Sequence, residues 1–470
     1  MNLHKEILRL AGPGILANIT VPLVGMVDIA VAGHLGDGSS AALIGGVSVG
    51  AMIFNLLYWN FGFLRVGTGG LTAQAYGASA DSADREAATG PILRRALRIA
   101  IGSGLALIVL QEVLLWLVLL LVPCTADVRE LATRYYHIRI WAAPATLSLF
   151  AFKGWFIGLQ DAVRPMTADL LVNGLNIVLS LALGFGPTGF AGIALATAVA
   201  QWAGFLYCLL AARRRYHFSV TLKHLKISKM QDSSQPNPLT CFQKNTDNQV
   251  VKRQGYHSFV QLNLNLFLRS LGMMAVYVGF TALAAGLGDT LLAVSAILMN
   301  LLMVFSYFSD GFAYAGEALT GRFIGAGDAE GVRCTIRQTF LWSGALALLF
   351  ILVYAVGSGP IFRLMTSDEA VMQAGMAYVP WLLMMPVVGC AAFTWDGIFI
   401  GATASKDLRN STLLCAAGFY AVWFAGIALL PGQAPETALH LLMGAYFTHL
   451  AIRALYLTLR RGSLIRALPV

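Results

Sequence analysis

Charged residues are scarce in this chain of 470 residues. Aspartate, glutamate, lysine and arginine make up 12% of the sequence, whereas 57% of the residues are hydrophobic. Soluble domains contain about 25% charged residues, so this composition excludes an ordinary soluble domain and predicts a protein of the lipid bilayer. We interpret the net charge of +9 as a signal of membrane topology and expect no nucleic-acid partner.

Motifs for ATP use and metal binding are also missing from the sequence. Neither an HExxH nor a Walker A pattern occurs, and no two of the eight histidines are four residues apart. The six cysteines show no CxxC or other metal-site spacing. We therefore expect neither an enzyme nor a cofactor-dependent protein. Without an ATP site, the expected energy source is an ion gradient.

Long hydrophobic runs dominate what is present. A helix needs about 20 residues to cross the ~30 Å hydrocarbon core of a bilayer, and hydropathy predicts twelve such spans. A lipid-facing backbone must satisfy its own hydrogen bonds, so the spans are expected to be helices and the fold class all-α. The predicted spans are 7–33, 41–66, 97–122, 131–158, 164–185, 188–212, 258–285, 291–318, 335–358, 371–402, 409–430 and 438–459.

Lysine and arginine gather at one set of span ends. They concentrate at the amino end, in the connections after even-numbered spans and at the carboxyl end, for example at Arg94, Arg213 and Arg461. The positive-inside rule then predicts a multi-pass protein of the cell inner membrane with both termini in the cytoplasm.

The sequence contains an internal repeat with a period of about 245 residues. The segment "LTAQAYGA" at 71–78 matches "LTGRFIGA" at 319–326, and "GWFIG" at 154–158 matches "GIFIG" at 397–401. Six spans per copy is an even number, so both copies enter the membrane from the same side. The repeat therefore predicts two pseudo-symmetric six-helix bundles in parallel orientation.

The repeat boundaries predict the domain organisation. We expect an amino-terminal lobe at 1–212, a polar cytoplasmic linker at 213–257 and a carboxy-terminal lobe at 258–470. Two such lobes can expose a shared cleft first to one side of the membrane and then to the other, so this organisation favours a transporter that works by alternating access.

Asp28 is a carboxylate inside the apolar run "VPLVGMVDIAVAG" of the first span. A buried acid in a membrane costs several kcal/mol unless it is protonated, paired or facing water, and such acids are usually functional. Pro22 removes the hydrogen bond to the carbonyl of residue 18 and so allows the helix to bend. We expect Asp28 to couple a proton or cation to transport; a structural hydrogen bond near the helix end is the alternative.

Polar residues on the fifth and sixth spans are the expected partners of Asp28. Asn173, Asn176 and Ser180 share one face of the fifth span because they are three and four residues apart. Thr197 and Gln201 share one face of the sixth. Such stripes also hold helices together without further function, so the residues alone leave helix packing and a proton or cation site open.

The second copy carries its own polar residues in "YFSDGFAYAGEALTGRF". Asp310 is the deeper of its two acids, and Glu317 lies two turns further along the same face, where it could pair with Arg322 or Arg269. Together with Asn173, Gln201 and Arg269, these two acids form a candidate substrate or carboxy-lobe polar site.

Lys153 and Asp396 occupy equivalent repeat positions, each directly before a GxFIG segment. A salt bridge between the two residues is one interpretation. Snorkelling of the lysine to the membrane interface is the other.

Several segments together resemble a known transporter family. They are "VPLVGMVDIAVAGHLG", "GLTAQAYGA", "GWFIGLQDAVRPM", "NGLNIVLS", "LGDTLLAVSAILMNLLMVFSYFSDGFAYAGEALTGRFIGAGD" and "DGIFIGATASKDLRNSTLL". These segments resemble the MATE (multidrug and toxic compound extrusion) family, and more closely its DNA-damage-inducible F (DinF-like) branch. The resemblance extends from about residue 7 to the last span, without the central linker.

The resemblance implies twelve helices in two six-helix lobes and export of amphipathic, often cationic organic compounds in exchange for protons or sodium ions. It also implies that Asp28 is the proton or cation site of the amino-terminal lobe, and that its protonation is linked to bending of the first helix at Pro22. Asn176 and Thr197 match the family's partners on the fifth and sixth helices.

Two departures from the family pattern remove acidic groups. Many relatives read "NIVLD" where this chain reads "NIVLS", so Ser180 replaces a second carboxylate. The seventh helix often begins with "NRD", and here the triplet is "NLN" at 263–265. The first departure favours proton coupling over a sodium site built on two acids. A sodium ion held by Asp28 with the neutral oxygens of Asn176, Ser180 and Thr197 remains an alternative.

These observations lead to one hypothesis for function and two alternatives. We expect a monomeric, ion-coupled antiporter, with H+ as the coupling ion, that exports cationic or amphipathic compounds and contacts membrane lipids. A sodium-coupled multidrug exporter is one alternative. A lipid or lipid-linked precursor flippase is the other, and a basic cavity containing Arg65, Arg139 and Arg269 would favour it.

Overall fold

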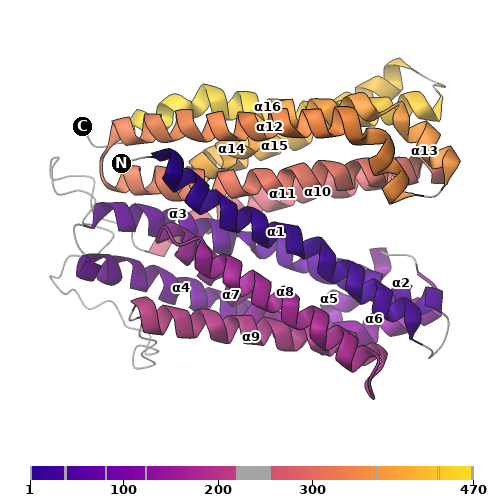
Figure 1. The fold of residues 1–470 in the computed structure, drawn as a ribbon, viewed down its shortest axis with the longest axis horizontal. Coiled ribbons are helices and arrows are strands. Elements are labelled where there is room, and N and C mark those ends of the chain that lie inside the picture. The colour runs from indigo at the N-terminus through magenta and orange to yellow at the C-terminus, as the bar shows by residue number, and fades with distance from the viewer. Residues whose placement is uncertain are drawn as a thin grey trace. The chain divides into compact units, whose positions relative to one another are not determined.

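The structure is a computed structural model that describes residues 3–466 except 36–39, 80–81, 122–123, 217, 219–255, 367, 431 and 433. Every regular element in the described part of the chain is a helix, which confirms the all-α class. Most of the predicted linker lies outside the described residues. Figure 1 shows the helices, coloured by their order in the chain.

The number of spans agrees with the hydropathy pattern. Among the described residues, eleven helices are long and apolar enough to cross a membrane, and the number is twelve if the bent pair Asp84–Val109 with Gln111–Leu120 counts as one span. The members of this pair meet at 70°, so the predicted span 97–122 is not one continuous helix. Glu112, in the first turn of the second member, is hydrogen-bonded to His137 at 2.8 Å.

The predicted span 371–402 is also divided in the structure. A short helix, α13 (Glu369–Met376), precedes α14 (Val379–Gly401). Pro380 lies in the first turn of α14. A proline there needs no backbone donor and has a φ suited to starting a helix, so the chain begins a new helix at this point.

The chain divides into two compact units, each described by itself. The first unit comprises residues 16–259 and the second comprises residues 1–15 with 260–470, so α1 (Leu3–His34) contributes to both. The other helices of the first unit are α2 (Ser40–Trp59), α3 (Phe63–Ala78), α4 (Ser82–Val109), α5 (Gln111–Leu121), α6 (Ala126–Arg139), α7 (Ala143–Gly158), α8 (Val163–Gly184) and α9 (Phe190–Tyr216).

The second unit is built from helices of the second sequence copy. Its largest buried cluster draws aromatic side chains such as Phe305, Phe350 and Tyr446 from several of these helices. The helices besides α13 and α14 are α10 (Tyr256–Ala285), α11 (Asp289–Gly325), α12 (Ala329–Met365), α15 (Ser405–Leu429) and α16 (Pro435–Arg466).

The repeated GxFIG segment has a packing role in each unit. A Cβ atom at Gly154 of α7 would collide with the carbonyl oxygen of Arg65 on α3, and one at Gly397 of α14 would collide with that of Ala313 on α11. The last glycine of each segment makes the same kind of backbone approach one turn further on. Glycine is needed at these positions because no side chain fits between the two helices.

This packing predicts a sharp difference between two glycine substitutions. Gly154→Ala should lower the free energy of unfolding by about 1–3 kcal/mol, because the new methyl group forces α7 away from α3. Gly344→Ala is the control, since a Cβ at Gly344 of α12 meets no atom within 4 Å, and it should leave stability unchanged or raise it. Thermal unfolding of the purified variants measures the difference; equal melting temperatures would contradict this account of the motif.

Candidate functional site

Asp28 is buried inside the first unit, on the second half of α1. Its side chain has a neutral hydrogen-bond donor: Ser180 Oγ on α8 donates to Asp28 Oδ1 at 2.8 Å. Asp28 is 6% exposed and Ser180 is fully buried. The residue that replaces the second carboxylate of the family pattern is therefore in direct contact with Asp28.

The hydrogen bonds continue from Ser180 to α9. Ser180 Oγ also lies 3.4 Å from Asn176 Oδ1, one turn earlier on α8. Asn176 Nδ2 donates to Thr197 Oγ1 on α9 at 2.8 Å. Asp28, Asn176, Ser180 and Thr197 thus form one buried chain of polar groups across three helices, which we call the Asp28 network.

Two other residues of the predicted polar stripes lie outside this network. Asn173 Nδ2 donates to Thr20 Oγ1 on α1 at 2.7 Å, which makes a second polar contact between α1 and α8. Within the described part of the chain, no hydrogen bond joins Gln201 to the Asp28 network. Pro22 lies inside α1, between these two polar contacts with α8.

Arg139, at the end of α6, belongs to the same unit as Asp28. It donates to the hydroxyl of Tyr135 at 3.0 Å, and its guanidinium lies 4.7 Å from the ring centre of Phe54. Among the described residues, no lysine or arginine forms an ion pair with Asp28. The partner that Asp28 does have, the Ser180 hydroxyl, is neutral.

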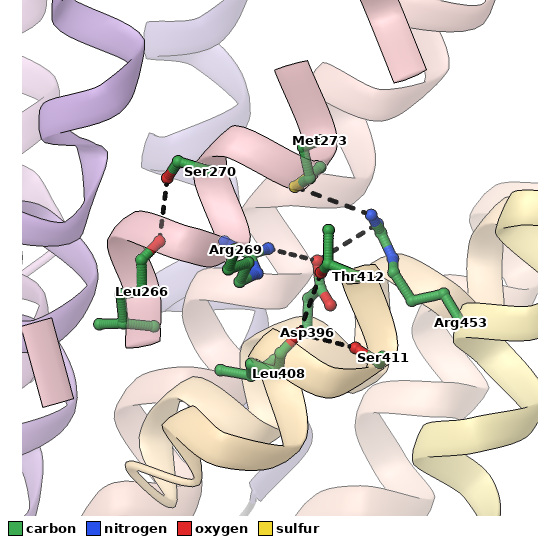
Figure 2. A network of polar contacts seen from close by, with 9 residues as sticks. All are labelled: Leu266, Arg269, Ser270, Met273, Asp396, Leu408, Ser411, Thr412 and Arg453. Atoms are coloured by element: carbon green, nitrogen blue, oxygen red, sulfur yellow. Dashed lines mark hydrogen bonds and ion pairs between the residues drawn. The ribbon is translucent and has the colours of Figure 1, made fainter. Parts of the chain in front are cut away.

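The equivalent residues Lys153 and Asp396 each have an ion-pair partner within their own unit. Lys153 Nζ forms an ion pair with Asp169 on α8. Asp396 Oδ2 accepts from Arg269 at 2.7 Å and lies 3.2 Å from Arg453 Nη2 (Figure 2). Distant helices supply these partners, and the spacing of residues in the sequence does not reveal them.

The two acids on α11 are separated by their surroundings. Glu317 is fully buried, whereas Asp310 is half-buried. Both arginines that the sequence suggested as partners of Glu317 contact other acids: Arg322 pairs with Glu6 at 3.0 Å, and Arg269 pairs with Asp396.

Arg453 is the polar residue that the sequence analysis missed. It lies on α16, is 1% exposed and pairs with Asp396. Its position inside the predicted span 438–459 could have identified it, since ionisable residues within membrane spans are rare and mark functional or paired sites.

The described residues also limit what the site can bind. They contain no group of three or more histidine, cysteine, aspartate or glutamate side chains that could hold a metal ion. The Asp28 network offers one carboxylate with hydroxyl and amide oxygens around it. Such a set can hold a proton, and it is poor in charge for a divalent ion.

The hydrogen bonds of the network predict the effect of removing one hydroxyl. Thr197→Val should destabilise the protein by about 1–3 kcal/mol, because the buried Asn176 amide loses its acceptor. Thr167→Val is the matched control: its hydroxyl is bonded only to its own helix backbone at the surface, and the change should stay within about 0.5 kcal/mol. Thermal unfolding in detergent tests both variants, and a loss no larger than the control would refute the contact.

Comparisons with known proteins agree with this architecture. The MatE family model matches residues 13–182 and 266–423. The chain is 37% identical to DNA damage-inducible protein F of Escherichia coli over 96% of this chain and 91% of that protein. It is 25% identical to multidrug and toxin extrusion protein 2 of Mus musculus over 90% of this chain and 68% of that protein.

A solved structure shows the same fold. A MOP superfamily transporter from Pyrococcus furiosus superimposes with a TM-score of 0.80, covering 99% of this chain and 97% of that one. Its sequence identity is 17%, so the match supports the fold alone.

Proposed function

Because the chain belongs to the MatE family of multidrug and toxin efflux transporters, we propose that it is a proton-coupled antiporter that uses Asp28 as its coupling group. It exports cationic or amphipathic organic compounds by alternating access. A proton entering from the outer side neutralises Asp28, and the accompanying rearrangement of the amino-terminal lobe expels the substrate.

The single observation that carries this proposal is the contrast between Asp28 and two other aspartates on predicted membrane spans, Asp169 and Asp396. Asp169 and Asp396 each have a lysine or arginine as an ion-pair partner. Asp28 instead accepts from the hydroxyl of Ser180. A carboxylate held by a fixed cation keeps its charge, whereas one held by a hydroxyl can accept a proton without leaving an unpaired buried cation.

Protonation of Asp28 would change the whole network. The neutral acid gains an O–H donor, so the Ser180 hydroxyl is free to turn and accept from it. The Ser180 hydroxyl hydrogen can then point to Asn176 Oδ1 instead of Asp28 Oδ1. Since the network links α1, α8 and α9, one proton alters the contacts of three helices, and Pro22 gives α1 a point at which to bend.

Four further assignments belong to the same proposal. The antiporter lies in the cell inner membrane with both termini in the cytoplasm, as the distribution of basic residues predicts. The functional division is into lobes at 1–212 and 258–470 joined by a linker at 213–257. The transporter works as a monomer. Among its alternatives, sodium coupling has specific support in the neutral oxygens of the network, which could join Asp28 around a hard monovalent cation.

The decisive experiment is transport by Asp28→Asn in proteoliposomes. We expect the variant to lose at least about tenfold in efflux of a fluorescent organic cation driven by a pH gradient, because an amide of the same shape cannot release a proton. Asp328→Asn is the matched control: Asp328 caps α12 by accepting from Gly331 N–H, and asparagine caps equally well.

The same vesicles separate the two coupling ions. A sodium gradient without a pH gradient should give no efflux if protons are the coupling ion. Undiminished pH-driven efflux by Asp28→Asn at equal protein incorporation would remove Asp28 from the mechanism. Efflux that depends on the sodium gradient and not on the pH gradient would show that the coupling ion is sodium.

A further inference from the structure

The second unit contains a buried cluster of two arginines and one aspartate. Arg269 on α10 and Arg453 on α16 reach the carboxylate of Asp396 on α14 from two sides (Figure 2). Both contacts use the same oxygen, Oδ2, at 2.7 Å and 3.2 Å respectively. The side chains are 12%, 1% and 11% exposed for Arg269, Arg453 and Asp396.

Guanidinium groups outnumber carboxylates among these three residues. Arginine stays protonated in proteins, so the two arginines share one carboxylate as their ion-pair partner. A buried charge without compensation costs several kcal/mol. At the equivalent position of the first repeat, Lys153 faces Asp169 one to one. The imbalance is therefore a feature of this unit and not of the shared fold.

Hydrogen-bond donors in the cluster are also left over. Within the described residues, Arg269 Nε and Arg453 Nε have no hydrogen-bond partner, and both are shielded from solvent. Arg453 Nη1 has only a methionine sulfur, that of Met273, at 4.0 Å. The nearby hydroxyls of Ser270 and Thr412 donate to the backbone of their own helices, and among the described residues neither accepts a hydrogen bond from Arg269 or Arg453.

We propose that this cluster, Arg269, Arg453 and Asp396, is a binding site for a carboxylate or phosphate group. Such an anion would accept from the unpartnered Nε–H groups of the two arginines. It also matches the planar fork of a guanidinium, which binds carboxylate and phosphate through two parallel N–H donors. Arg269, the more exposed arginine, forms the entrance to the site. Asp396 holds both arginines in place and competes with the incoming anion for their N–H donors. The site is separate from the Asp28 network and does not depend on proton coupling.

The first experiment measures anion binding by the full-length protein in a neutral detergent. Inorganic phosphate and benzoate are titrated by calorimetry and by thermal unfolding, against sodium chloride at equal ionic strength. We expect saturable binding and a rise in melting temperature for phosphate, benzoate or both, with no such rise for chloride. Equal responses to all three salts would overturn the proposal.

Substitutions then locate the binding. Arg453→Gln and Arg269→Gln should each weaken the apparent affinity by about tenfold or more, since each removes a charge-assisted pair of hydrogen bonds. Arg363→Gln, at an exposed position near the end of α12, is the matched control and should bind as the wild type does. Binding that survives both cluster substitutions would place the anion elsewhere and overturn the proposal.

Asp396→Asn distinguishes a binding site from a purely structural ion pair. Removal of the internal competitor should tighten anion binding, and added phosphate should restore part of the lost thermal stability. A structural role alone predicts a less stable protein that phosphate does not rescue, which would also overturn the proposal. Because Arg269 is the more exposed arginine, Arg269→Gln and the wild-type titration still decide the matter if Arg453→Gln fails to fold.

A final comparison separates a free anion from a lipid headgroup. The protein is placed in nanodiscs of phosphatidylcholine with or without phosphatidic acid, and phosphate is titrated into each. If a lipid headgroup is the source, phosphate should bind more weakly in the anionic nanodiscs, and this difference between the two nanodiscs should disappear in Arg269→Gln. Equal binding in the two supports a free anion.

Discussion

The cost of an uncompensated charge in the membrane is the constraint on which the polar architecture of this protein depends. Lys153 is paired with Asp169, and Arg322 with Glu6, so these permanent charges cancel within their own unit. Asp28 has a hydroxyl donor instead of a cation. In a medium where an isolated carboxylate is expensive, that choice makes protonation the simplest way to neutralise Asp28.

The first unit contains two kinds of helix contact, and they differ in what a proton can change. Gly154 brings α7 against the backbone of α3, and no ionisable side chain takes part in that approach. The contacts of α1 with α8 are hydrogen bonds, from Ser180 to Asp28 and from Asn173 to Thr20. Protonation acts directly on the first of these bonds. One hydrogen bond between α1 and α8 can therefore respond to a proton, whereas the approach of α7 to α3 cannot.

The sequence predicted those features that depend on local periodicity. Hydropathy located twelve spans, and i,i+4 spacing placed Asn176 and Ser180 on one face because a helix repeats every 3.6 residues. Contacts between distant helices were not predictable in this way: Arg322 pairs with Glu6, and Arg453 contacts Asp396 from another helix. Spacing within one helix carries no information about which face of another helix lies opposite.

The two sequence copies share a fold and differ in the charges they bury. The residue that corresponds to Asp28 in the second copy is near Phe280, which is 1% exposed and packs against Tyr446. The residue that corresponds to Lys153 is Asp396, which changes the sign of the charge at that position. An acid with a neutral partner therefore occurs in the first copy and an excess of guanidinium in the second. The shared fold therefore does not dictate the charges: two bundles with the same helix packing surround different ionisable groups, and the two proposed ligands, a proton and an anion, follow from that difference.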